Sequence, residues 1–107
     1  MALTRDFKRM VVERIRRDPK FAKALLDEAA TLFLNGEPHT ARLVFRDLVN
    51  ATIGFEELAG ETGIPVKSLH RMLSGRGNPS MDNLAAILGE VRKRLGVEIQ
   101  AHTIEAA

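Results

Sequence analysis

The side chains best suited to contacting an anionic partner are Lys67, Arg71 and Arg76, which share a stretch without acidic residues. Residues 64–80 contain no Asp or Glu, although the chain of 107 residues has 14 of them. A locally basic segment in a nearly neutral protein is what contact with phosphate requires. The pattern therefore indicates a nucleic-acid contact, and the alternative interpretation is an ordinary solvated basic face.

Other kinds of chemistry find no support in the residues. Cys is absent, which excludes thiolate metal ligands and disulfides. His39, His70 and His102 stand far apart and show no metal-ligand spacing. Neighbouring carboxylates such as Asp27 and Glu28 point in different directions on a helix. We expect no enzyme activity, no metal and no cofactor.

The basic stretch overlaps residues 55–74, whose pattern predicts a helix-turn-helix. Ala59 is the small residue needed where two helices approach closely, and Gly63 accepts the positive φ of the turn. Four apolar residues then hold the helices together: Leu58, Ile64, Leu69 and Met72. The outward positions of the second helix, which in this motif face the major groove, are Pro65, Val66, Lys67, His70 and Arg71.

The residues after this segment strengthen the prediction. Gly75 ends the second helix, and an amphipathic helix begins at Met81 with Ser80 as its N-cap. The run G-x-x-N-P-S followed by such a helix resembles the phage-repressor-like helix-turn-helix family, also called the XRE type. DNA binding is what this resemblance implies.

The rest of the chain is also predicted to be helical, apart from its last residues. Asp18-Pro19 and Glu37-Pro38 each start a helix, because Pro suits the first helical position. The helical stripes place four aromatic residues in the core: Phe7, Phe21, Phe33 and Phe45. Residues 97–103 alternate apolar and polar side chains, which predicts one short strand. A lone strand needs a partner, so we expect another chain to supply it.

Length and composition favour a single domain in the cytoplasm. We divide residues 1–107 into N-terminal helices (1–37), a helix-turn-helix core (38–96), and a strand with a tail (97–107). The formal net charge is +2, with eight basic and three acidic side chains in residues 1–23. The absence of Cys fits a reducing compartment. No uncharged stretch exceeds eight residues, so we expect no membrane segment and no signal peptide.

The whole chain resembles one branch of the repressor-like proteins, the addiction-module antidotes or HigA-type antitoxins. Three runs carry the likeness: RDLVNATIGFEELAGETG (46–63), KSLHRMLS (67–74) and GNPSMDNL (77–84), with a weaker run, DPKFAKALLDEA, at 18–29. This resemblance implies a bacterial or phage-derived protein that binds an RNA-cleaving toxin of the RelE or HigB kind and represses its own operon.

The family pattern also implies which residues contact DNA. Base contacts are expected from Val66, Lys67, Ser68, His70 and Arg71, and phosphate contacts from Thr62, Arg76 and Asn78. Two positions depart from the pattern. Phe55 stands where Gln or Ser often touches a phosphate, and Pro65 with Val66 replaces polar residues, although Val66 can contact a thymine methyl group.

The sequence thus predicts an all-α, repressor-like domain of five to six helices with a short C-terminal β-strand. We expect a homodimer that binds double-stranded operator DNA, is associated with the nucleoid, and serves as the antitoxin of a type II toxin–antitoxin operon. The acidic residues Asp27, Glu28 and Glu37 are the expected toxin contact, and ordinary solvated charge is the alternative. Two other functions stay open: a stand-alone phage or plasmid regulator without a toxin, and a protein–protein adaptor.

Overall fold

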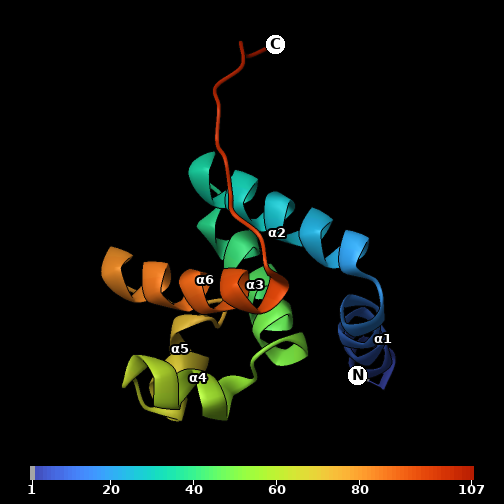
Figure 1. The fold of residues 1–107 in the computed structure, drawn as a ribbon, viewed down its shortest axis with the longest axis vertical. Coiled ribbons are helices and arrows are strands. Elements are labelled where there is room, and N and C mark those ends of the chain that lie inside the picture. The colour runs from blue at the N-terminus through green and yellow to red at the C-terminus, as the bar shows by residue number, and fades with distance from the viewer. Residues whose placement is uncertain (1) are drawn as a thin grey trace.

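Six helices follow one another along the chain in a computed structural model that describes residues 2–107, with side chains from residue 6 onward (Figure 1). They are α1 (Ala2–Arg17), α2 (Pro19–Leu34), α3 (Pro38–Ala51), α4 (Phe55–Thr62), α5 (Val66–Met72) and α6 (Met81–Leu95). The expected all-α class and the number of helices are confirmed for this part of the chain.

Capping residues explain where the helices begin. The Asp18 carboxylate accepts a hydrogen bond from the Phe21 amide at 3.1 Å, and Pro19 occupies the first turn of α2. The Ser80 hydroxyl accepts one from the Asn83 amide at 3.1 Å and starts α6. Pro38 likewise opens α3, although Glu37 makes no side-chain cap there. The predicted starts of α2, α3 and α6 are therefore confirmed.

The central element is α3, which packs against α1, α2, α4 and α6. In Figure 1, α2 crosses the upper part of the view and the pair α4–α5 lies at the bottom. Phe45, Leu48 and Val49 of α3 are at most 1% exposed, and each such side chain contributes roughly 1.5–3 kcal/mol by burial. From the other helices the core receives Leu26, Leu58, Leu69, Ile87 and Val91.

The predicted strand at residues 97–103 is wrong for the single chain, because no strand is present among residues 2–107. After Gly96 the chain runs past α2 as an extended segment (Figure 1). Val97 and Ile99 rest partly buried on the core, while Glu98 and Gln100 are exposed. The alternation is therefore present, but a strand also requires a neighbouring strand for its ladder of hydrogen bonds.

The expectation that Phe7 is a core residue is also wrong. Its side chain is 63% exposed and that of Met10 is 65% exposed, so this stripe of α1 faces away from the other described helices. Of the other three aromatic residues, Phe45 is fully buried, whereas Phe21 and Phe33 are partly buried against the core. The Arg14 guanidinium lies 4.3 Å from the centre of the Phe21 ring and covers it from solvent.

Candidate nucleic-acid interface

The helices α4 and α5 are joined by a turn of three residues, Gly63, Ile64 and Pro65. Gly63 has φ 75° and its amide donates to the Ala59 carbonyl at 2.9 Å, so the predicted left-handed turn is confirmed. Leu58 and Leu69 are completely buried between the helices, and Ala59, Ile64 and Met72 pack against them at the edge of the core. This packing fixes the orientation of α5 relative to α4.

Three long side chains of α5 are exposed: Lys67, His70 and Arg71. Each carries hydrogen-bond donors that can reach beyond the helix surface. The other two expected base contacts differ. Val66 is half-buried and packs against the core, and Ser68 is half-buried. The outward face of α5 is thus cationic, whereas the side chain of Val66 is turned partly toward the core.

The ring of His70 is stacked on the ring of Phe55. The two ring centres lie 3.9 Å apart and the planes are 13° from parallel. Phe55, the first residue of α4, is only 6% exposed, so it acts as a support under α5. The apolar ring of Phe55 thus gives His70 a flat surface to pack on.

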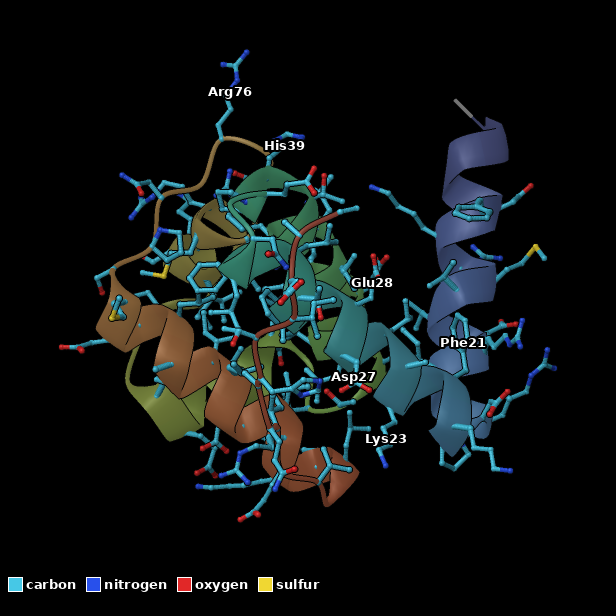
Figure 2. The ribbon with its side chains drawn as sticks, turned by 90° about the horizontal axis from the view of Figure 1, so that it is seen from above. Phe21, Lys23, Asp27, Glu28, His39 and Arg76 are labelled. Atoms are coloured by element: carbon cyan, nitrogen blue, oxygen red, sulfur yellow. The ribbon has the colours of Figure 1, made fainter. Side chains whose placement is uncertain are left out.

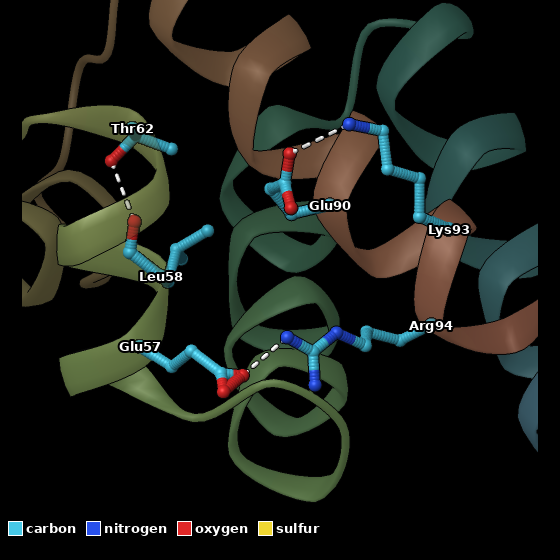
Figure 3. Close-up of polar contacts among 6 residues, drawn as sticks. All are labelled: Glu57, Leu58, Thr62, Glu90, Lys93 and Arg94. Atoms are coloured by element: carbon cyan, nitrogen blue, oxygen red, sulfur yellow. Dashed lines mark hydrogen bonds and ion pairs between the residues drawn. The ribbon is translucent and has the colours of Figure 1, made fainter.

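The Thr62 hydroxyl is already used inside the protein (Figure 3). It donates to the Leu58 carbonyl at 2.8 Å and accepts from the Ile64 amide at 3.2 Å. Both bonds are local to the turn, so in the free protein this hydroxyl closes the end of α4. Arg76 and Asn78, the other two expected phosphate contacts, are exposed.

Arg76 lies at the tip of the segment between α5 and α6 and points away from the body of the protein (Figure 2). This tip is bonded to α3. The Arg42 guanidinium donates through Nε to the Ser74 carbonyl and through Nη2 to the Gly75 carbonyl, each at 3.1 Å. His39 Nδ1 lies 2.9 Å from the same Gly75 oxygen. Neither Arg42 nor His39 is among the contacts predicted from the sequence.

Gly77 brings this segment against the end of α5. A Cβ atom at this position would overlap the carbonyl oxygen of Met72 and lie 2.7 Å from that of Arg71. The Gly77 amide donates to the Ser74 carbonyl at 3.0 Å. Glycine is therefore required because of this close approach of backbone to backbone, and φ at Gly77 is not positive.

An exposed ion pair connects α4 to α6. The Arg94 guanidinium contacts the Glu57 carboxylate, while Lys93 pairs with Glu90 at 3.2 Å within α6 (Figure 3). Pairs this exposed contribute at most about 1 kcal/mol each. Most of the stabilisation of α4 against the core therefore comes from its buried apolar side chains, and the ion pair contributes less.

A second basic region lies between α1 and α3, away from α5. Lys8, Arg9, Arg16 and Arg46 line a groove with a volume of about 330 Å³, together with Asp47. Burial raises the pKa of the Asp47 carboxyl, and the positive charges of Lys8 and Arg46 partly oppose this. Arg16 donates to the Asn50 carbonyl at 3.0 Å and fastens α1 to the end of α3.

The residues expected to contact a toxin are all at the surface. Asp27 and Glu28 are exposed on α2 (Figure 2), and Glu37 is exposed just before α3. Among residues 2–107 no group of acidic, His or Cys side chains could hold a metal ion. In the same described part, no helix is long and apolar enough to cross a membrane.

Comparison with protein-family models, with curated proteins and with solved structures finds no match to this chain.

Proposed function

We propose that this protein is a sequence-specific DNA-binding repressor that inserts α5 into the major groove of its operator. The observation that carries the proposal is the exposure of Lys67, His70 and Arg71 on a helix whose orientation is fixed by the buried Leu58 and Leu69. No acidic residue occurs in residues 64–80 to repel phosphate. This combination supports DNA over an acidic protein partner. With α5 in a major groove, Arg76 would add its positive charge beside the phosphate backbone of the DNA.

Each side chain of the proposed interface has a distinct role. Arg71 can donate two parallel hydrogen bonds to O6 and N7 of a guanine, and Lys67 can donate to acceptors on an adjacent base. His70 lies on the same exposed surface, and the half-buried Ser68 and Val66 border it, where the exposed part of Val66 suits a thymine methyl group. Arg76 and Asn78 contact phosphate and set the register, and Thr62, whose hydroxyl bonds to the Leu58 carbonyl in the free protein, lies at the end of α4 as the third phosphate contact.

Selection from a random duplex library tests the proposal. We expect the wild-type protein to enrich one sequence, and Arg71→Ala to lose about 1–3 kcal/mol of binding free energy and selectivity at one base pair per half-site. Lys23→Ala is the matched control, because Lys23 is an exposed cation on α2. No enrichment, or an Arg71→Ala affinity equal to that of the control, would contradict the proposed interface.

We also propose that the repressor is a homodimer joined through its C-terminal segment. Residues 101–107 are exposed and without a backbone ladder, and a groove of about 1070 Å³ separates residues 99–104 from α2. Ile104, 83% exposed beside this groove, is an apolar side chain that pairing with a second copy would cover. A two-fold dimer would read half-sites about 34 Å apart.

The third part of the proposal is a role as the antitoxin of a RelE- or HigB-like toxin. An RNA-cleaving toxin has a basic active surface because its substrate is anionic, so the exposed carboxylates of Asp27 and Glu28 can complement it. A toxin should then co-purify with the protein when the neighbouring gene is co-expressed. If no neighbouring product binds or is toxic, a stand-alone regulator is the correct function.

A further inference from the structure

Arg76 belongs to the segment 74–77, which is neither helix nor strand. The Ser74 carbonyl accepts from the Gly77 amide within the segment, and the Ser74 and Gly75 carbonyls also bond to side chains of α3, 32 to 36 residues earlier in the chain. Arg42 supplies two donors, and His39 supplies a third toward the oxygen of Gly75.

These contacts fix the direction in which Arg76 leaves the protein. The Gly75 carbonyl and the Arg76 amide belong to one planar peptide unit, so fixing the oxygen also orients the bond that leads to the Arg76 Cα. The Arg42 guanidinium is planar as well, and its Nε and Nη2 donors engage both carbonyls at 3.1 Å. A rigid fork thus determines the two peptide planes before Arg76.

We propose that Arg42, assisted by His39, is a positioning residue of the DNA interface, holding the segment 74–77 so that Arg76 meets a phosphate. This inference rests on the proposed DNA-binding function. Arg42 itself is partly buried, and two of its donors are committed to the loop carbonyls. It therefore acts through Arg76 and not by its own contact with DNA.

The substitution Arg42→Lys separates positioning from charge. Lysine retains the positive charge but is a point charge that cannot form the planar two-donor fork. We expect Arg42→Lys to weaken binding of the selected duplex about fivefold, as for the impairment of one phosphate contact. Arg46→Lys, one turn further along α3 and in the groove facing α1, is the matched control and should bind like the wild type.

A double-mutant cycle tests whether Arg42 acts through Arg76. In the Arg76→Ala background, Arg42→Lys should change the affinity by less than about twofold, because the contact it serves is already gone. An equal loss in both backgrounds would show that Arg42 contributes independently and would overturn the proposal. An Arg42→Lys affinity equal to that of the wild type would overturn it as well.

Measurements on the free protein distinguish failure of this inference from failure of the proposed function. Amide relaxation and hydrogen exchange at Arg76 and Gly77 should show a more mobile loop in Arg42→Lys and an unchanged loop in Arg46→Lys. An unchanged loop in Arg42→Lys overturns the positioning role whatever the DNA result. If the loop loosens but the wild-type protein selects no duplex, the DNA-binding proposal fails while the ordering role of Arg42 stands.

Discussion

Replacement of Gly77 by Ala should destabilise the protein strongly, although the change adds a single methyl group. The new Cβ atom would overlap the Met72 carbonyl and lie 2.7 Å from that of Arg71, and both obstacles are backbone atoms of α5. No side-chain rotation can relieve the overlap, so the segment 74–77 must move away from the helix. Overpacking of this kind costs about 1–3 kcal/mol.

The same movement disturbs hydrogen bonds around the loop. The bond from the Gly77 amide to Ser74 and the bonds from Arg42 each contribute about 0.5–1.5 kcal/mol. Because these bonds would be weakened and not all lost, we expect a total loss of about 3 kcal/mol, at the low end of the sum and a large part of the 5–15 kcal/mol typical of a small domain. At about 4 °C per kcal/mol, the melting temperature should fall by about 12 °C.

Gly89→Ala is the matched control, because it makes the same chemical change where, apart from the local helix backbone, no described atom lies within 4 Å of the new one. Gly89 is in the middle of α6, so alanine should stabilise the protein by about 0.5–1 kcal/mol. Urea unfolding followed by circular dichroism measures both variants, since the chain has no Trp or Tyr for fluorescence. A Gly77→Ala stability within about 0.5 kcal/mol of the wild type would refute the steric argument.

Three further predictions concern the assembly, the partner and the pH dependence. Truncation after Gln100 removes only exposed residues, so sedimentation should show folded monomers; an unchanged dimer would place the interface elsewhere. Charge reversal at Asp27 and Glu28 should lower affinity for a co-purifying toxin in titration calorimetry and leave DNA binding intact, and equal affinities would exclude this surface. Burial raises the folded-state pKa of Asp47, so the folded protein holds this proton more tightly than the unfolded chain does. The contribution of Asp47 to the free energy of unfolding is therefore fully present below the usual value of 3.8 and is lost as the pH rises through the raised pKa. Asp47→Asn should therefore raise the melting temperature at pH 7 more than below pH 3.8, and the opposite order would contradict this assignment.

Features determined by neighbouring residues were predictable from the sequence. Asp18 and Ser80 cap helices through bonds to amides three residues away, and Gly63 adopts its left-handed conformation within a single turn. The exposed face of α5 follows from the helical period once Leu69 is assigned to the core. Much of the candidate interface is therefore determined by residues only a few positions apart in the sequence.

Features that depend on distant residues were not predictable. Arg42 and His39 bond to backbone carbonyls, which leave no trace in residue types, and Gly77 is required by an approach of another backbone segment. The stripe with Phe7 is a correct helical pattern, but periodicity cannot tell whether another helix covers it. Residues 97–103 alternate apolar and polar side chains as a strand does, but they make no ladder of backbone hydrogen bonds. The pattern within one segment does not say whether a second strand lies beside it.

The stacking of His70 on Phe55 has a consequence for the thermodynamics of recognition. A surface histidine normally samples several rotamers, and fixing it on binding costs roughly 0.5–1.5 kcal/mol of conformational entropy. Here the ring lies flat on a buried neighbour 3.9 Å away before any partner arrives, so much of that cost falls on folding. A ring fixed in this way adapts poorly to a mismatched base. On the proposed interface, His70 would therefore discriminate against a base that requires a different ring orientation, and its contact would carry a smaller entropy penalty on binding than that of an exposed side chain without such a neighbour.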